Sequence, residues 1–308
     1  MPSNDTTLPA LTDSDAPRKP TVALALGAGG AKGLAHIGVI EELTAQGFQI
    51  TAIAGCSMGA LIGGIYATGK LDVYRDWVIT LAKLDVLKLV DWTLRGGGLI
   101  KGEKIIGTLL EMIGDEQIED LPLSFTAVAT DIDREREIWL SRGSLFEAIR
   151  ASIAIPTIFR PHTINGRRLL DGGLLNPVPV TPLIRDPADY LVAVSLDGAA
   201  EPATPDTLDD KTRHRGLLRR LLPHGGDKPE VKTHEPGVLE LMGRSMDLMQ
   251  ANLARLRLAA YEPDLLIQLP RNVSTVYEFY RARELIELGR ERTREVLEGW
   301  REHHPGRT

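Results

Sequence analysis

A serine flanked by glycines stands where the sequence predicts a strand to meet a helix. The segment Gly55-Cys56-Ser57-Met58-Gly59 fits the pattern G-x-S-x-G, in which the serine sits on a sharp turn and glycines two residues away avoid clashes. The apolar run 49–54 predicts a strand before it, and 58–68 predicts a helix after it. A hydroxyl over a helix N-terminus could act as a nucleophile, because the N–H groups there favour developing negative charge. The alternative for the pentapeptide alone is a glycine-rich packing turn.

A glycine loop precedes this serine along the chain. The segment Gly27-Ala28-Gly29-Gly30-Ala31-Lys32-Gly33 follows a predicted strand, 21–26, and opens a predicted helix. Such a loop could bind a dinucleotide, but Lys32 stands where the third glycine of that motif belongs, and the next strand ends in Ser57 instead of an acidic residue. Consecutive N–H groups at a helix N-terminus suit an oxyanion equally well. We therefore predict an oxyanion loop, with a dinucleotide loop and a packing loop as the alternatives.

A serine nucleophile needs a base, and Asp171 is the candidate in the best position. Asp171 ends a predicted strand behind the hairpin turn Asn165-Gly166, and Gly172-Gly173 lets the backbone approach another loop. A turn closed by a side-chain-to-backbone hydrogen bond is the alternative for this tripeptide. None of the histidines follows a strand on a sharp turn: His36 falls in the first helix, and the others except His162 fall in segments predicted to be poorly structured or terminal. His162, close to the hairpin, is the one that position alone does not exclude. The histidines of the chain are His36, His162, His214, His224, His234, His303 and His304.

Taken together, the three motifs resemble those of the patatin-like phospholipase family. G-x-G-x-x-K-G, G-x-S-x-G and D-G-G occur in that order, and the stretches 151–156 and 176–179 are similar to bacterial members related to neuropathy target esterase. The resemblance covers roughly residues 20–200. It implies an α/β fold, a three-layer α/β/α sandwich with a mainly parallel central sheet, and a Ser–Asp dyad that works without histidine.

The resemblance also implies a role for each matching residue. Ser57 is the nucleophile and Asp171 the base. Lys32 matches a basic position that supports the loop or meets a lipid phosphate, and a side chain at Gly30 is expected to intrude where the loop meets substrate. The implied oxyanion donors are Gly29, Gly30 and Ala31, and the glycines that support the motifs are Gly27, Gly33, Gly55, Gly59, Gly172 and Gly173.

The implied activity is a serine esterase that hydrolyses acyl esters of phospholipids or lysophospholipids through an acyl-enzyme, with no cofactor and no metal. A carboxylate base needs partial desolvation to raise its pKa, and the leucines at 169, 170, 174 and 175 could supply it around Asp171. The alternatives are an acyltransferase of related fold, acyl transfer to glycerol or a lysolipid, and a non-catalytic regulator that binds lipid or a partner. The intact motifs argue against the regulator.

The elements that must position these residues alternate as strand, loop, helix, strand and helix, which predicts right-handed crossovers around a parallel sheet. We expect a disordered tail over 1–19, one patatin-like domain over 20–300 and a short tail over 301–308. Within the domain, 198–236 is predicted to be a flexible insertion and 237–300 a mainly helical C-terminal part.

Composition narrows the functional class further. The 308 residues are 43% hydrophobic and carry a formal net charge of −6, which argues against general nucleic-acid binding. The single cysteine, Cys56, excludes an intramolecular disulfide and suits a reducing compartment. With no signal peptide or membrane span predicted, we expect a cytoplasmic protein. Basic residues alternate with leucines over 211–222 and could form a helix that touches the inner face of a membrane, the alternative being a solvated loop.

Overall fold

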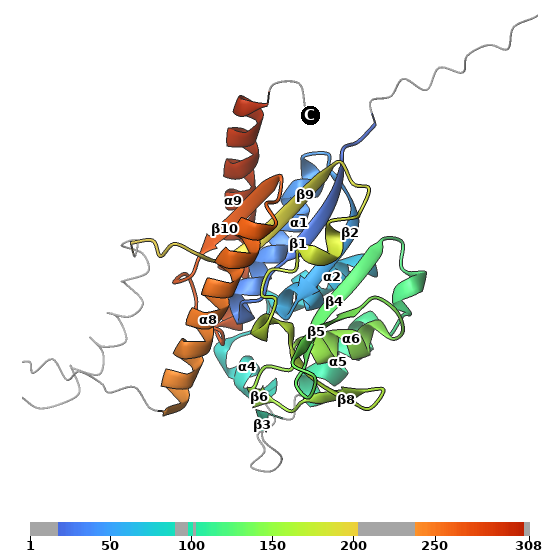
Figure 1. Cartoon of the computed structure of the whole chain (residues 1–308). Helices are drawn as coiled ribbons and strands as arrows, with labels where there is room; N and C mark the ends of the chain where they lie inside the picture. The colour runs from blue at the N-terminus through green and yellow to red at the C-terminus, as the bar shows by residue number, and fades with distance from the viewer. Residues whose placement is uncertain (1–17, 90–97, 101–102, 203–237, 305–308) are drawn as a thin grey trace, which may run out of the picture.

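The chain folds around a mixed, mainly parallel sheet of eight strands (Figure 1). The computed structural model describes residues 18–89, 98–100, 103–202 and 238–304. The order across the sheet is β10-β9-β1-β2-β4-β8-β7, with β5 paired to β4 as well. The first five strands of this order run parallel, while β5 and β8 run antiparallel to β4. The strands of the sheet are β1 (Thr21–Leu26), β2 (Gln49–Cys56), β4 (Ser124–Asp131), β5 (Arg136–Leu140), β7 (His162–Ile164), β8 (Arg167–Asp171), β9 (Tyr190–Gly198) and β10 (Leu265–Pro270).

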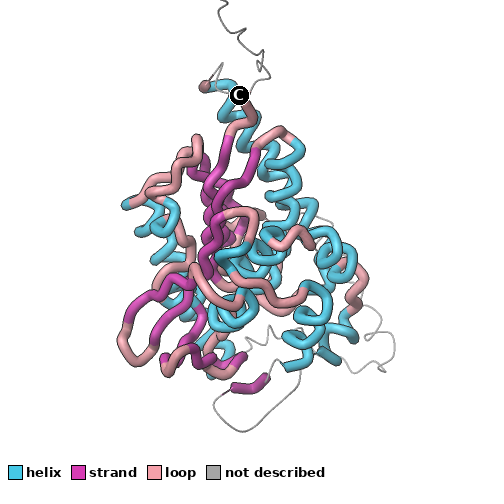
Figure 2. The backbone as a smooth tube through the Cα atoms, turned by 90° about the vertical axis from the view of Figure 1, so that its right-hand side faces the viewer, coloured by secondary structure: helices cyan, strands magenta, loops and turns pink. Residues whose placement is uncertain are grey.

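Helices cover both faces of the sheet, most of them on one face (Figure 2). Large strand residues such as Leu24 and Ile53 belong to the core shared with α1, α2 and α9, whereas strand alanines such as Ala25 and Ala54 belong to a thinner core shared with α8. The predicted three layers are therefore present but unequal. The helices are α1 (Ala35–Ala45), α2 (Met58–Ala67), α3 (Leu71–Val78), α4 (Lys83–Leu89), α5 (Glu103–Ile113), α6 (Leu145–Ser152), α8 (Val238–Ala260) and α9 (Ala282–His303).

The C-terminal part is built into the same sheet. β10 pairs in parallel with β9, and α9 packs along α1 at the sheet's large core. The predicted mainly helical C-terminal part therefore also supplies an edge strand. A second, two-stranded sheet joins β3 (Gly98–Ile100) to β6 (Thr157–Phe159).

The predicted hairpin turn Asn165-Gly166 is confirmed, and a second local feature, a helix cap at Ser144, arises in the same way from residue type. Asn165 and Gly166 both have positive φ, 50° and 72°, and they connect the antiparallel pair β7 and β8. Ser144 caps α6, because its Oγ accepts the N–H of Glu147 at 3.0 Å. Both local structures depend on only a few neighbouring residues, so residue type alone can predict them.

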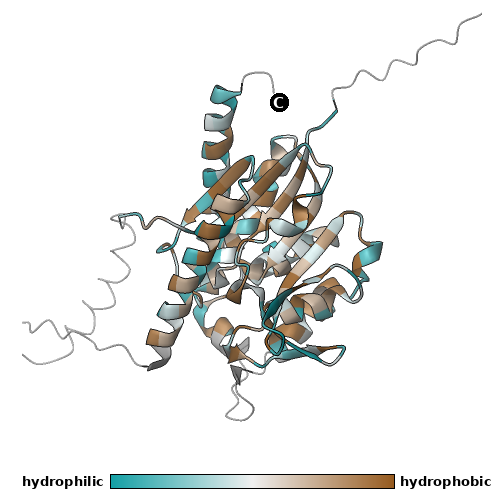
Figure 3. Cartoon of the chain, viewed as in Figure 1, coloured by the Kyte–Doolittle hydropathy of each residue, from teal (hydrophilic) through white to brown (hydrophobic). Residues whose placement is uncertain are grey.

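Other predictions concern residues outside the described ranges. These are most of the tail 1–19, most of the insertion 198–236 and the basic segment 211–222; Gly198 itself is still part of β9. Figure 3 shows brown segments of high hydropathy on the central strands and on α8. Several apolar side chains of α8 are exposed, namely Leu241, Met242, Leu248, Met249 and Leu256. Within the part of the chain that the structure describes, none of the helices combines the length and apolarity that crossing a membrane requires.

Candidate active site

β2 and β8 pair with the same edge of β4 from opposite directions, so that their last residues meet there. This arrangement brings Ser57 and Asp171, the predicted dyad, together. β2 runs parallel to β4, and its last residue, Cys56, lies opposite Val128. β8 runs antiparallel to β4, and its last residue, Asp171, lies opposite Ala129. β5 pairs with β4 over 127–131, so β2 and β8 must share the other edge. Ser57, directly after Cys56, therefore comes next to Asp171.

Ser57 has a strained backbone that its surroundings hold in place. Its φ of 55° and ψ of −123° are unusual for a residue other than glycine, and its side chain is almost completely buried at the start of α2. Its N–H donates to Oγ of Ser152 at 2.9 Å, and that hydroxyl donates to the carbonyl of Val128 at 2.6 Å. Ser152 was not among the residues predicted for the site, although it lies in the stretch 151–156 that contributed to the family resemblance.

The glycines of the two catalytic motifs permit backbone contacts that no side chain would allow. A Cβ on Gly59 would lie 2.1 Å from the carbonyl oxygen of Leu26, at the end of β1. A Cβ on Gly172 would lie 2.2 Å from the carbonyl oxygen of Val128. Both turns are therefore pressed onto strand ends, as the predicted tight backbone requires.

Asp171 is a buried carboxylate with its two oxygens in different surroundings. Oδ1 accepts the N–H of Gly173 at 2.7 Å and lies 3.9 Å from the Cys56 thiol. Oδ2 is buried and makes no hydrogen bond of good geometry with any described residue. Burial raises the pKa of Asp171 from 3.8 to about 6, while its interactions with the Ser57 side chain, the Gly173 N–H and Cys56 oppose that rise. The predicted turn hydrogen bond and the predicted base therefore coexist.

The leucines expected to desolvate this carboxylate differ in their own burial. Leu169 and Leu170 are buried, and Leu174 and Leu175 are half-buried. The buried Cys56 side chain lies against the carboxylate as well, and burial together with the Asp171 charge raises the pKa of its thiol. Cys56 is therefore a neutral neighbour of the base.

The glycine loop lies against both motifs. A Cβ on Gly173 would come within 3.2 Å of the Ala28 Cβ, and a Cβ on Gly33 would come within 2.3 Å of the Met58 Cβ. Gly30 has a φ of +55°, which favours glycine. The loop, the serine turn and the D-G-G turn thus form one site at the carboxyl ends of β1, β2 and β8.

The backbone N–H groups of the loop have different partners. Ala28 donates to the carbonyl of Pro177 at 2.8 Å, and Ala31 donates to the carbonyl of Val276 at 3.1 Å. In the described ranges, no acceptor takes the N–H of Gly29 or Gly30. Ala31 was predicted as a third oxyanion donor, and in this structure its N–H already has the Val276 carbonyl as an acceptor.

Two further expectations about the loop are resolved by its contacts. Lys32 is buried and donates from Nζ to the carbonyl of Leu196 at 3.0 Å and to Asp197 Oδ1 at 3.2 Å, so of its two implied roles it supports the loop. A side chain at Gly30 was expected to meet substrate. Its Cβ would instead lie 2.7 Å from the Cβ of Val276, so it would first meet the protein's own chain.

Each of the four described histidines bonds to a group other than Ser57. His36 donates from Nε2 to the carbonyl of Gly27 at 2.8 Å, and burial lowers its pKa to about 4. His162 bonds to Glu147 at 2.7 Å, and His303 and His304 bond to carbonyls of the last turns of α9. His214, His224 and His234 lie outside the described ranges. The structure brings His36 to the oxyanion loop, which its place within a helix had not suggested.

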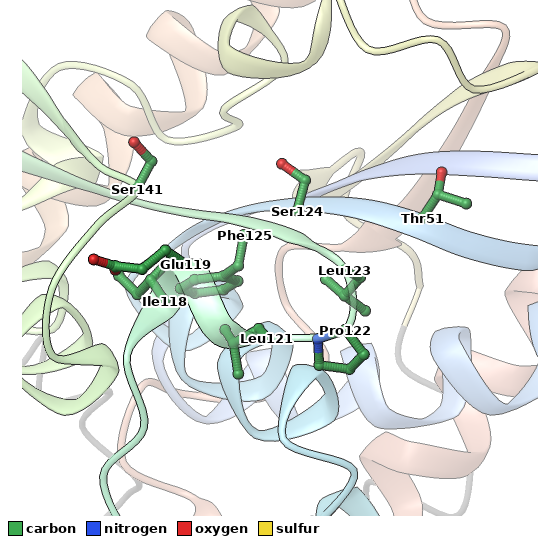
Figure 4. Close-up of a pocket in the computed structure, with 9 residues that line it drawn as sticks. All are labelled: Thr51, Ile118, Glu119, Leu121, Pro122, Leu123, Ser124, Phe125 and Ser141. Carbon is green, nitrogen blue, oxygen red and sulfur yellow. The ribbon is translucent and has the colours of Figure 1, made fainter.

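A cavity of about 370 Å³ lies elsewhere and contains no predicted catalytic residue (Figure 4). It reaches Thr51 near the start of β2 and Ser124 at the start of β4; Thr51 precedes Ser57 by six residues, roughly 20 Å along the strand. Within the described ranges, no three histidine, cysteine or acidic side chains gather as a metal site would need. The lining consists of Thr51, Ile118, Glu119, Leu121, Pro122, Leu123, Ser124, Phe125 and Ser141.

Comparisons with known proteins agree with the geometry. Residues 24–184 match the family model described as patatin-like phospholipase. The chain is 37% identical to an uncharacterized NTE family protein of Mycobacterium tuberculosis, over 91% of this chain and 92% of that protein. It is 29% identical to the lysophospholipase NTE1 of Yarrowia lipolytica, over 72% of this chain and 16% of that protein. VipD from Legionella pneumophila aligns at a TM-score of 0.45 and 17% identity, covering 92% of this chain and 67% of that chain. The family match ends before β9, so α8, β10 and the contact from Val276 lie outside it.

Proposed function

Because the chain belongs to the patatin-like phospholipase family, whose activity is of the lipid acyl hydrolase kind, we propose that it is a serine esterase acting on acyl esters of phospholipids or lysophospholipids. The observation that supports this most directly is the head-on meeting of β2 and β8, which puts Ser57 beside a buried Asp171. One relative, the NTE1 protein of Yarrowia lipolytica, is named a lysophospholipase, and this favours the same substrate class.

The reaction begins with attack of Ser57 Oγ on the ester carbonyl while Asp171 Oδ2 takes the hydroxyl proton. The N–H groups of Gly29 and Gly30 stabilise the tetrahedral oxyanion. Collapse breaks the bond to the alcohol, which leaves with the proton from Asp171, and an acyl-Ser57 ester remains. Asp171 then takes a proton from water, the hydroxide oxygen attacks the acyl carbon, and the second collapse returns the proton to Ser57 and releases a fatty acid.

A carboxylate with a raised pKa suits this base function. A pKa near 6 leaves Asp171 ionised at neutral pH and makes it a stronger base than an exposed aspartate. The bond from the Gly173 N–H holds Oδ1, so the carboxylate keeps its orientation while Oδ2 exchanges the proton. Burial and the turn therefore each contribute one requirement of general-base catalysis.

The rival functions make different demands on the site. Transfer to glycerol or a lysolipid uses the same acyl-Ser57 intermediate, with an alcohol in place of water. A non-catalytic regulator has no need of an activated hydroxyl, so a strained Ser57 held by Ser152 argues against it. Product analysis with and without added acceptor alcohol separates hydrolysis from transfer.

The deciding experiment combines active-site labelling with lipid products. We expect a fluorophosphonate to modify Ser57, identified by peptide mass spectrometry, and a lipid panel to yield free fatty acid. Ser57→Ala and Asp171→Asn should each abolish hydrolysis with the fold retained, whereas His36→Gln and His162→Gln should keep measurable activity. Labelling of another residue, or a folded histidine variant as inactive as Ser57→Ala, contradicts the dyad.

Contact with a membrane surface is a separate part of the proposal. Its sequence basis, the basic segment 211–222, lies outside the described residues. We expect deletion of 205–230 to reduce co-sedimentation with anionic vesicles while activity on a water-soluble ester persists. Unchanged sedimentation of the deletion variant ends the membrane hypothesis.

A further inference from the structure

The turn between β10 and α9, residues 273–281, lies directly on the oxyanion loop, and we call it the C-terminal strap. The carbonyl of Val276 accepts the N–H of Ala31 at 3.1 Å. An added Cβ at Gly30 would lie 2.7 Å from the Cβ of Val276 and 2.9 Å from its carbonyl oxygen. The strap comes from outside residues 24–184, the part that matches the family model. One end of the oxyanion loop is thus held by a remote part of the chain.

The Glu278 side chain bonds back to the two residues that precede Val276. Its Oε2 accepts the N–H of Thr275 at 2.8 Å and the hydroxyl of Ser274 at 3.2 Å. Arg281 donates from Nη1 to Glu278 Oε2 at 3.2 Å and to the carbonyl of Val273 at 2.6 Å. The bonds and charge from these neighbours outweigh desolvation and lower the pKa of Glu278, so it remains a carboxylate at neutral pH. One side chain therefore determines how the strap presents the carbonyl that meets Ala31.

The two anchors of the loop enclose the N–H groups of Gly29 and Gly30, which have no acceptor among the described residues. Ala28 is bonded to Pro177 on one side and Ala31 to Val276 on the other, and only Gly29 and Gly30 lie between them. Glycine restrains its own backbone least, so the direction of these two N–H groups depends on the anchors. Oxyanion stabilisation requires donors fixed before the reaction, since reorientation during the reaction would cost free energy.

We propose that Glu278 is a positioning residue for the oxyanion loop. It holds the strap so that the Val276 carbonyl binds the Ala31 N–H, and this bond keeps the Gly29 and Gly30 N–H groups directed at the developing oxyanion. The inference rests on the proposed esterase function. A strap that only covers the loop would affect stability or substrate access, whereas a positioning strap affects the transition state.

The test compares Glu278→Ala with a matched control, Glu284→Ala. Arg281 also donates to Glu284, from Nε at 2.8 Å, but Glu284 belongs to α9 and makes no bond to residues 273–276. For Glu278→Ala we expect kcat to fall on the order of 10-fold or more with KM unchanged. The affinity for a trifluoromethyl ketone, which forms an oxyanion adduct with the serine, should fall by the same factor. Glu278→Gln, which keeps an acceptor for Thr275, should recover part of both losses, and Glu284→Ala should match the wild type.

A backbone variant tests the Val276 carbonyl itself. Replacing Tyr277 with its α-hydroxy acid turns the 276–277 amide into an ester, whose carbonyl is a weaker acceptor, and leaves every side chain in place. We expect the same joint fall in kcat and ketone affinity, and this variant decides the matter if Glu278→Ala does not fold. Unchanged kcat and ketone affinity overturn the inference, as does a fall in kcat without a fall in ketone affinity. A wild-type protein that forms neither fatty acid nor a Ser57 adduct overturns the proposed function and this inference with it.

Discussion

Asp171 binds the N–H of Gly173 through Oδ1 at 2.7 Å, and its other oxygen, Oδ2, has no such bond to any described residue. The turn thus occupies one oxygen and leaves the other for proton exchange. A structural turn and a catalytic base are usually competing interpretations of an Asp-Gly-Gly sequence. Here one carboxylate is compatible with both, because its two oxygens are in different surroundings.

The pH dependence of activity should follow Asp171. Only the ionised carboxylate can take the Ser57 proton, and burial raises its pKa to about 6. We therefore expect kcat/KM for an uncharged ester to rise with pH and to level off above an inflection near 6. A stopped assay between pH 4.5 and 8.5 measures this. The inflection should survive in His36→Gln; its loss there would assign the titration to the histidine.

The titration of Asp171 should make activity rise with pH but make the stability of the folded protein fall with pH. The pKa of Asp171 in the folded protein lies above its ordinary value of 3.8, so folding favours the protonated form. The stability contribution is fully present below about 3.8 and is lost as pH rises through about 6, a change on the order of 3 kcal/mol. Asp171→Asn lacks this loss, so its urea midpoint should exceed that of the wild type at pH 8 and approach it at pH 4. Ser57→Ala keeps Asp171 and should retain most of the wild-type pH dependence; equal slopes in wild type and Asp171→Asn would contradict the assignment.

Removal of the Ser152 hydroxyl should affect the serine turn. Ser152→Ala leaves the Ser57 N–H and the Val128 carbonyl without their buried partner, which costs about 1–3 kcal/mol. The strained φ of Ser57 then loses a restraint, so we expect kcat to fall as well. Chemical denaturation and fluorophosphonate labelling rates measure the two effects. The exposed Ser124, at the other end of β4, provides the control, and a Ser152→Ala protein that labels at the wild-type rate would rule out this role.

Lys32→Met should weaken the oxyanion loop without changing head-group preference. The Lys32 ammonium is buried on the Leu196 carbonyl and on Asp197, so its loss removes a support of the loop. Lys70→Met is a matched control, because Lys70 also bonds a carbonyl and a carboxylate, those of Ile113 and Glu116. We expect both variants to lose stability and only Lys32→Met to lose kcat. A selective loss on phosphate-bearing esters, relative to neutral ones, would instead indicate lipid contact.

Gly30→Ala should damage activity more than the same change at Gly47. Both glycines have positive φ, +55° and +91°, so alanine strains the backbone at either position. At Gly30 the new Cβ meets Val276, whereas at Gly47 nothing lies within 4 Å. We expect a fall in kcat on the order of 100-fold for Gly30→Ala, the usual effect of losing an oxyanion donor, and none for Gly47→Ala. Equal activity of the two folded variants would show that the loop does not serve the reaction.

The sequence by itself determined the local geometry of this site. The sharp turn at Ser57 and the Asn165-Gly166 hairpin both depend on a few neighbouring residues, so residue type predicts them directly. The alternation of apolar strands and helices likewise predicted the mainly parallel sheet. Each of these features is encoded by residues close together in the sequence, so the sequence alone was sufficient to predict it.

Only the tertiary structure decided which groups share the site. From the sequence, Ser152 is simply a residue near a helix end; its hydrogen bond to the Val128 carbonyl exists because α6 packs against β4. Likewise, the Ala31 N–H has an acceptor only because the strap places the Val276 carbonyl beside it. The same holds for the meeting of Cys56 with Asp171, which follows from two strands sharing one edge of β4 in opposite directions. Such contacts join segments far apart in sequence. Hydrophobic burial of the whole sheet selects their register, and no local residue pattern carries that information.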